Sequence, residues 1–178
     1  MIAVFLANGF EEIEALAVVD ILRRAGLDVQ TIGVGSDVIK GAHNISVSAD
    51  MLDTHLDTSS LEAVVLPGGM PGTLNLEKSA IVQSAIQTAM DNHTVVAAIC
   101  AAPSILDHAG YLKGRKYTCY PGFESSTDGE KVDAPYVTDG NITTGCGPGA
   151  AIGFALELVR VLVSKEKADE IAGGMQCQ

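Results

Sequence analysis

The chain has 178 residues, of which 47% are hydrophobic, and it carries a formal net charge of −11 at pH 7. This length fits one α/β domain with a substantial core, so we expect residues 1–178 to form a single domain. The negative charge argues against nucleic acid and anionic membrane surfaces as partners, and no apolar run approaches the roughly 20 residues of a membrane span.

The N-terminal segment and the cysteines indicate the cellular compartment. Met1–Leu6 has no basic segment before its apolar residues, which favours a first strand over a signal peptide. The four cysteines show no paired short spacing, so neither a zinc site nor a disulfide framework is indicated. They are Cys100, Cys119, Cys146 and Cys177. We therefore expect a cytoplasmic protein without a metal site.

The first strand, Ile2–Leu6, is followed by a helix over about residues 12–25. Glu14 starts the apolar stripe of this helix, which continues through Val18, Ile21, Leu22 and Ala25. Glu12 is predicted on the opposite, solvated side. A carboxylate on an apolar stripe is costly unless it is protonated or hydrogen-bonded, which makes Glu14 a candidate functional group. Alternatively, it reaches the rim or caps backbone N–H groups.

The middle of the chain predicts further strands and a hairpin. A second strand is expected at 28–34, a β-hairpin at 38–51 and a buried strand at 61–66. His43 and His55 lack partners at metal-ligand spacing, so we interpret them as surface residues. Gly68 and Gly69 follow the buried strand, where they permit either an anion-binding turn or a plain tight turn.

The second half continues the alternation of helices and strands. Helices are expected at 78–91, 149–163 and 166–172, and strands at 95–100, 115–120, 136–139 and 142–144. The first of these helices should bury Val82, Ala85, Ile86 and Ala89, and the second Ile152, Leu156, Val159 and Val163. Alternating strands and helices predict a doubly wound, mostly parallel sheet sandwiched by helices.

Cys100 stands at the sharpest junction of this pattern. It ends the apolar run that begins at Val95, and Pro103 suits the first turn of a new helix. The order of strand, cysteine and helix is typical of a nucleophile elbow, in which helix N–H groups would lower the pKa of the cysteine. A small buried cysteine at a strand end is the alternative. Because ligands bind beyond the carboxyl ends of parallel strands, Glu14, Gly68, Gly69 and Cys100 are expected to converge.

Three motifs resemble the ThiJ/PfpI superfamily, within it the branch of the parkinsonism-associated deglycase and its bacterial relatives. They are Gly9–Glu14, Val64–Gly69 and Ala97–Pro103, and the similarity runs from about residue 1 to 170. The resemblance implies a flavodoxin-like fold, a homodimer and no cofactor.

The resemblance also assigns roles to single residues. It implies that Cys100 is the reactive cysteine and that Glu14 is a protonated glutamate hydrogen-bonding its thiolate or sulfinate. It places Gly69 and Ala101 at an oxyanion pocket. Arg24 matches an arginine near the dimer interface, and Gly147–Pro148 matches a loop that approaches the partner's site.

Two positions depart from relatives in the superfamily. Tyr120 stands where many relatives have a histidine facing the cysteine, and Ala101 stands where the protease-like branch has one. A cysteine–histidine dyad is therefore absent from the motif positions, which makes peptidase activity improbable. Tyr120 and Pro148 are candidate site-lining residues. Cys146 is a candidate second redox thiol, or a buried spectator, whereas Cys119 cannot easily face the cleft together with Tyr120.

These residues support two hypotheses. The first is a stress-response protein whose Cys100 acts on reactive carbonyls such as methylglyoxal, or on their adducts, as a glyoxalase or deglycase. The second is a thiol redox sensor or chaperone without turnover, in which an oxidant converts Cys100 to a sulfinate.

Overall fold

A computed structural model describes residues 1–177. Its main sheet has the strand order β10-β11-β7-β6-β1-β2-β5, and every neighbouring pair is parallel except β10 and β11. The strands are β1 (Ile2–Leu6), β2 (Val29–Gly33), β5 (Met51–Leu52), β6 (Ala63–Leu66), β7 (Val95–Ile99), β10 (Tyr136–Asp139) and β11 (Ile142–Gly145). The predicted doubly wound, mostly parallel sheet is confirmed, including the hairpin of β10 and β11.

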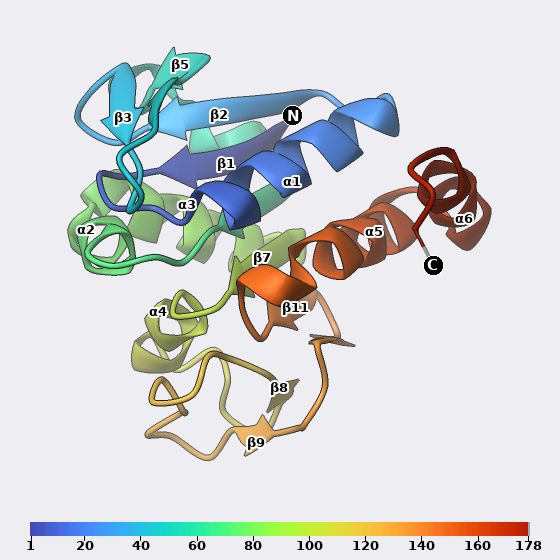
Figure 1. Ribbon diagram of the computed structural model, residues 1–178. Coiled ribbons are helices and arrows are strands. Elements are labelled where there is room, and N and C mark those ends of the chain that lie inside the picture. The colour runs from blue at the N-terminus through green and yellow to red at the C-terminus, as the bar shows by residue number, and fades with distance from the viewer. Residues whose placement is uncertain (178) are drawn as a thin grey trace.

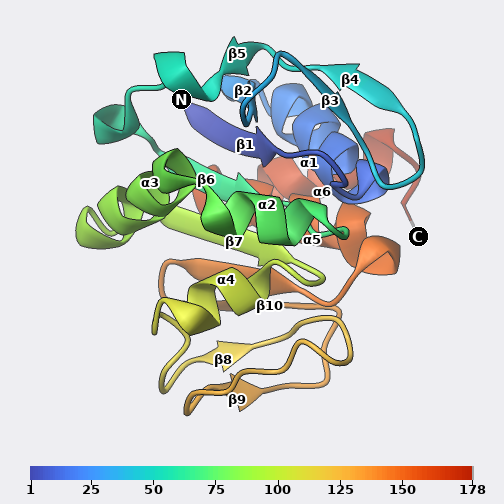
Figure 2. The ribbon, with the colours of Figure 1, turned by 90° about the vertical axis from the view of Figure 1, so that its left-hand side faces the viewer.

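Helices cover both faces of this sheet (Figures 1 and 2). One face carries α1 (Glu12–Arg24), α5 (Ala151–Leu162) and α6 (Lys165–Gly174), and the other α2 (Gly72–Lys78), α3 (Ala80–Asp91) and α4 (Pro103–His108). Short 3₁₀ turns lie at Asp53–His55, Thr58–Ser60 and Pro148–Ala150. Alternate side chains of β1 enter separate cores, with Val4 packed in the α1 and α5 layer and Phe5 in the α3 layer. Within residues 1–177, no helix is both long enough and apolar enough to cross a membrane.

A separate hairpin lies over the start of α1. It consists of β3 (Val38–Lys40) and β4 (Ser46–Ser48), which pair antiparallel as the sequence predicts. Its connecting loop is held to the chain before α1, because Ala42 N–H donates to the Phe10 carbonyl at 2.8 Å. Glu12 is therefore buried under this loop, with 5% of its surface exposed, and the prediction of a solvated Glu12 is wrong.

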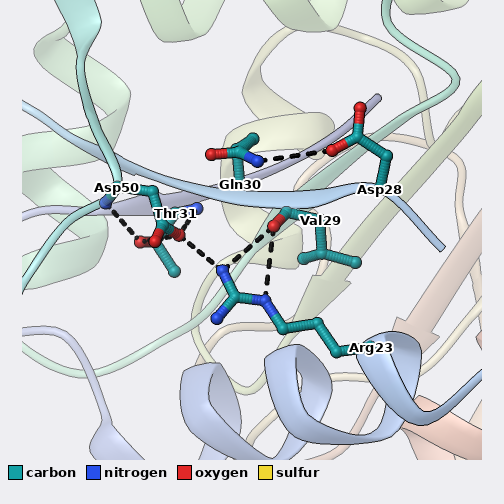
Figure 3. A network of polar contacts seen from close by, with 6 residues as sticks. All are labelled: Arg23, Asp28, Val29, Gln30, Thr31 and Asp50. Atoms are coloured by element: carbon teal, nitrogen blue, oxygen red, sulfur yellow. Dashed lines mark hydrogen bonds and ion pairs between the residues drawn. The ribbon is translucent and has the colours of Figure 1, made fainter. Parts of the chain in front are cut away.

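The other end of α1 is tied to the sheet by Arg23. Figure 3 shows its guanidinium donating to the Val29 carbonyl at 3.0 Å and pairing with Asp50 at 2.6 Å. Asp50 in turn accepts hydrogen bonds from the N–H and hydroxyl of Thr31 on β2. These contacts fix α1 along the sheet, so the position of its first turn beside the strand ends is fixed as well.

Three local predictions need correction. The expected strand at 115–120 is reduced to β8 (Lys116–Tyr117), which pairs with β9 (Glu130–Lys131) outside the main sheet. Helix α2 begins at Gly72, shortly after the glycines that follow β6, and was not predicted. Helix α3 buries the four residues expected. On α5, Val159 is buried as expected and Leu156 is half-buried, but the other buried residues are Ala151, Phe154, Ala155 and Leu158. Ile152 and Val163 are exposed instead, because α5 is apolar on more than one face.

Candidate active site

Cys100 occupies a strained turn between β7 and α4. Its φ is +65°, a left-handed conformation that costs energy in a residue with a side chain and is characteristic of functional turns. Hydrogen bonds hold both sides of this residue, since its N–H donates to the Gly145 carbonyl and its carbonyl accepts from Tyr120 N–H, each at 2.9 Å. Pro103 is the first residue of α4. The geometry is that of the elbow expected from the sequence.

Glu14 reaches the same point from α1 and is completely buried. Its Oε2 accepts a hydrogen bond of 2.7 Å from Gly68 N–H. Its Oε1 has no hydrogen bond of standard geometry to a residue in 1–177, although the carboxyl and the Cys100 thiol lie close enough for each to shift the pKa of the other. Oε1 is therefore available to form a hydrogen bond with an oxygen atom of an oxidised Cys100 or of a substrate.

The glycines after β6 make this approach possible. A Cβ on Gly68 would lie 2.7 Å from the Cys100 Cβ and 2.9 Å from Glu14 Oε2. Gly69 has a φ of +89°, and a Cβ there would lie 2.4 Å from the Glu11 nitrogen. The N–H groups of Gly69 and Ala101 are directed at the Cys100 sulfur, where they favour the thiolate. Gly68 differs from these two, because its N–H holds Glu14.

The sequence of this chain matches a known protein family. The model of the DJ-1/PfpI family matches residues 1–161. The chain belongs to the DJ-1/PfpI family.

Several members of the DJ-1/PfpI family match nearly the whole chain. Protein dj-1beta of Drosophila melanogaster is 34% identical over 97% of this chain and 94% of its own length. Deglycase PH1704 of Pyrococcus horikoshii is 34% identical over 88% of this chain and 95% of its own. The solved structure of oxidized DJ-1 from Toxoplasma gondii is 32% identical, covers 98% of this chain and 97% of its own, and has a TM-score of 0.94.

The electrostatics of this DJ-1/PfpI site set Glu14 and Cys100 in competition for a proton. Burial, assisted by the charge of Glu11, raises the pKa of Glu14 to about 7, against the Gly68 hydrogen bond and the neighbouring Cys100 thiol, which lower it. Burial and then the neighbouring Glu14 carboxylate raise the pKa of Cys100 to about 12, against the N–H groups of Ala101 and Gly69. The two groups titrate as a pair, and above about pH 7 they hold one proton between them.

This result overturns the expected fall in the pKa of Cys100. The elbow supplies the N–H groups that the sequence predicts, and they act in the predicted direction. Burial and the neighbouring carboxyl outweigh them. A thiolate at Cys100 is therefore favoured only in the state in which Glu14 carries the shared proton.

Tyr120, Cys146 and Pro148 lie together, but beside the Cys100 pair rather than on it. All three line a cavity of about 640 Å³, together with Lys131 and residues of the 132–135 segment. Tyr120 connects the cavity to the elbow through its backbone bond to Cys100, and its half-exposed ring lies against Gly147. Cys119 also borders this cavity, although it is almost completely buried.

Two contributors to the site were not predicted as such. Gly145, on β11, accepts the Cys100 N–H, and Glu11 places a second charge near Glu14. Glu11 stands inside the Gly9–Glu14 motif, which was the available signal, whereas the pairing of β11 with β7 could not be read from the sequence. His43 and His108 pair with glutamates on α1 and α2, away from the thiol.

Proposed function

We propose that this protein is a cofactor-free enzyme of the glyoxalase or deglycase type that acts on reactive carbonyls, such as methylglyoxal, or on their early adducts. Cys100 is the nucleophile and Glu14 is the group that moves the proton. The observation that carries the proposal is the buried Glu14–Cys100 pair, in which the pKa of Glu14 is raised to about 7. A general acid–base group works best when its pKa lies near the working pH.

In the first step, the sulfur of Cys100 forms a bond to the aldehyde carbon, and the π bond of the carbonyl becomes a lone pair on oxygen. The proton shared by the pair resides on Glu14 as the thiolate attacks, and it moves to that oxygen to give a neutral hemithioacetal. The N–H groups of Gly69 and Ala101, which favour negative charge at the sulfur, stabilise the thiolate before attack. No electrons are gained or lost in this step.

The choice of carbonyl substrates has two supports. A relative that is 34% identical is named a deglycase. The cavity beside Cys100 has a volume of about 640 Å³, far more than a three-carbon aldehyde needs, which favours an adduct with a larger group attached.

The test is turnover of methylglyoxal and of its adduct with a thiol by the purified chain. The wild type should consume many equivalents per chain, and Cys100→Ser should consume none. Cys177→Ser removes an exposed thiol away from the site and should behave like the wild type. Equal turnover by Cys100→Ser and wild type would refute Cys100 as the nucleophile.

The second candidate function is a redox sensor or chaperone that reacts once at Cys100. It is favoured by the unpartnered Oε1 of Glu14, which could donate a proton in a hydrogen bond to a sulfinate. Mild peroxide should then give a sulfinate on Cys100 before the other thiols react. Glu14→Leu should reduce its yield, since the sulfinate would lose a buried partner at a cost of about 1–3 kcal/mol. If Cys100 reacted once per chain and no carbonyl substrate were turned over, this function would be favoured over the first.

We also propose that the protein is a cytoplasmic homodimer that associates beside α1. Ile13 and Leu16 are apolar side chains exposed on this helix, and Arg24, half-exposed at its end, pairs within residues 1–177 only with Asp20 of the same helix. Sedimentation at micromolar concentration should give twice the mass of 18.4 kDa. A single species of 18.4 kDa would contradict the dimer.

A further inference from the structure

A second group of titratable side chains lies at the start of α1, under the β3–β4 loop. Glu11, Glu12 and His43 each bring one oxygen or nitrogen atom to within 4.8 Å of the others. The proposed carbonyl chemistry uses none of these side chains directly. The sequence predicted a surface histidine at position 43, because no partner lies near it at metal-ligand spacing; in the structure its imidazole contacts Glu12, 31 positions earlier.

The two carboxylates compete for a single donor. His43 Nδ1 lies 3.0 Å from Glu12 Oε2 and 3.6 Å from Glu11 Oε2. A ring nitrogen carries one proton, which can make a good hydrogen bond to only one of these oxygens. The Glu11 side chain has 11% of its surface exposed, and its ion pair with His43 at 3.6 Å is longer than a hydrogen bond. A cation that contacts both carboxylates would neutralise them more completely than the single imidazole does.

The distances from His43 Nδ1 to the two carboxylates suit a metal ion. Zinc binds carboxylate oxygen and imidazole nitrogen at about 2.0–2.2 Å, so two ligands of a tetrahedral site lie about 3.4 Å apart. The distances of 3.0 and 3.6 Å from His43 Nδ1 fall on either side of this value. Replacing the Nδ1 proton with a metal ion would let one cation contact both carboxylates and the imidazole.

The ligands are also held in place by their surroundings. The other oxygen of Glu12, Oε1, accepts hydrogen bonds from His43 N–H at 2.8 Å and from Ile45 N–H at 3.4 Å. Gly41 lies so close that a Cβ there would be 2.3 Å from this oxygen. Oε2 of Glu12 is thereby directed at the imidazole, which is the supporting shell that metal ligands require.

We propose that Glu11, Glu12 and His43 form a binding site for one divalent transition-metal ion, with Zn²⁺ as the probe. Because His43 is 68% exposed, a metal ion can enter from solvent without rearrangement of the fold, and water can complete the coordination. The site is separate from the Cys100 thiol and holds its metal through nitrogen and oxygen alone.

A second histidine–glutamate pair in the same chain provides the matched control. His108 Nδ1 contacts Glu77 Oε1 on the surface, and no third ligating side chain within residues 1–177 joins them. If any such pair bound Zn²⁺, His108→Ala would lose as much binding as His43→Ala. The proposal requires that His43→Ala loses Zn²⁺ binding and that His108→Ala does not.

The experiment is calorimetric titration of the full chain with Zn²⁺ at pH 7.5. The wild type, Cys100→Ser and His108→Ala should each bind one Zn²⁺ ion. His43→Ala and Glu11→Gln should bind this ion more than tenfold more weakly. When Co²⁺ replaces Zn²⁺, the bound Co²⁺ should give no sulfur-to-metal absorption band. Circular dichroism verifies that each variant is folded, which is expected because His43 is exposed.

Three results would overturn the proposal. One is equal Zn²⁺ binding by the wild type, His43→Ala and Glu11→Gln. Another is a sulfur-to-metal band that disappears in Cys100→Ser. The third is no binding by the wild type, as expected if Arg24 of a second copy of the chain neutralises Glu11 in the dimer.

Discussion

Glu12 and Glu14 lie two residues apart on α1, and both are almost completely buried, yet their pKa values move in opposite directions. Burial opposes ionisation of Glu12, but donors from His43 and Ile45 outweigh it and lower the pKa. Burial raises the pKa of Glu14 to about 7, because among residues 1–177 Gly68 alone donates a hydrogen bond to this carboxyl. Depth of burial and the number of donors together decide which carboxyl keeps its proton, because Glu14 lies deep in the core with one N–H donor, whereas Glu12 lies beside the exposed His43 and has several donors.

The largest expected effect tests whether Glu14 moves a proton. Glu14→Gln retains the oxygen that accepts the Gly68 N–H but has no acid–base capacity. Turnover of methylglyoxal should fall by about 100-fold or more, the usual contribution of a general acid–base group. Glu77→Gln alters a carboxyl on α2 and is the control. If Glu14→Gln turned over like the wild type, the carboxyl would not be the proton-transfer group.

The next prediction uses the pH dependence of stability to compare the native and unfolded states of Glu14. Between pH 4.5 and about 7, native Glu14 keeps a proton that the unfolded chain has released. The free energy of unfolding of the wild type should therefore fall, relative to Glu14→Gln, by about 3 kcal/mol as the pH rises through this window. Urea unfolding of both proteins at pH 4.5, 6 and 7.5 measures the difference. A constant difference would mean that the native pKa is not raised.

The smallest expected effect disturbs the donors of Glu12. Gly41→Ala places a methyl group 2.3 Å from Glu12 Oε1, so the side chain must move away from its two N–H donors. We expect a loss of about 1–3 kcal/mol in the free energy of unfolding at pH 7. Gly173→Ala, in α6 with open space around it, is the matched control. Equal stability of Gly41→Ala and wild type would show that the loop does not constrain Glu12.

The same two residues show how far sequence reasoning reaches. The apolar stripe from Glu14 to Ala25 correctly predicted that Glu14 is buried, because the stripe depends on helix periodicity alone. Glu12 was misplaced, because its cover is a hairpin loop 30 residues away that periodicity cannot reveal. The elbow at Cys100 could be predicted from the apolar run and Pro103. The rise in its pKa could not, because it depends on how closely α1 approaches β7.

The remaining differences have similar causes. The segment at 115–120 contains residues that suit a strand, but its partner is β9 rather than the main sheet. Helix α5 is apolar on two faces, so its sequence alone does not decide which side chains are buried. Packing against α1 places Phe154 and Leu158 inside. Both outcomes depend on tertiary contacts that are not encoded in local patterns.

The two backbone bonds of Cys100 have a consequence for protein synthesis. Its carbonyl is held by Tyr120 and its N–H by Gly145, so the turn is completed by residues 20 and 45 positions later in the chain. A ribosome that has made Cys100 must therefore add 45 further residues before the elbow can close. Until then the newly made thiol lacks the strained geometry of the finished protein, so the reactive site cannot assemble before Gly145 has been made.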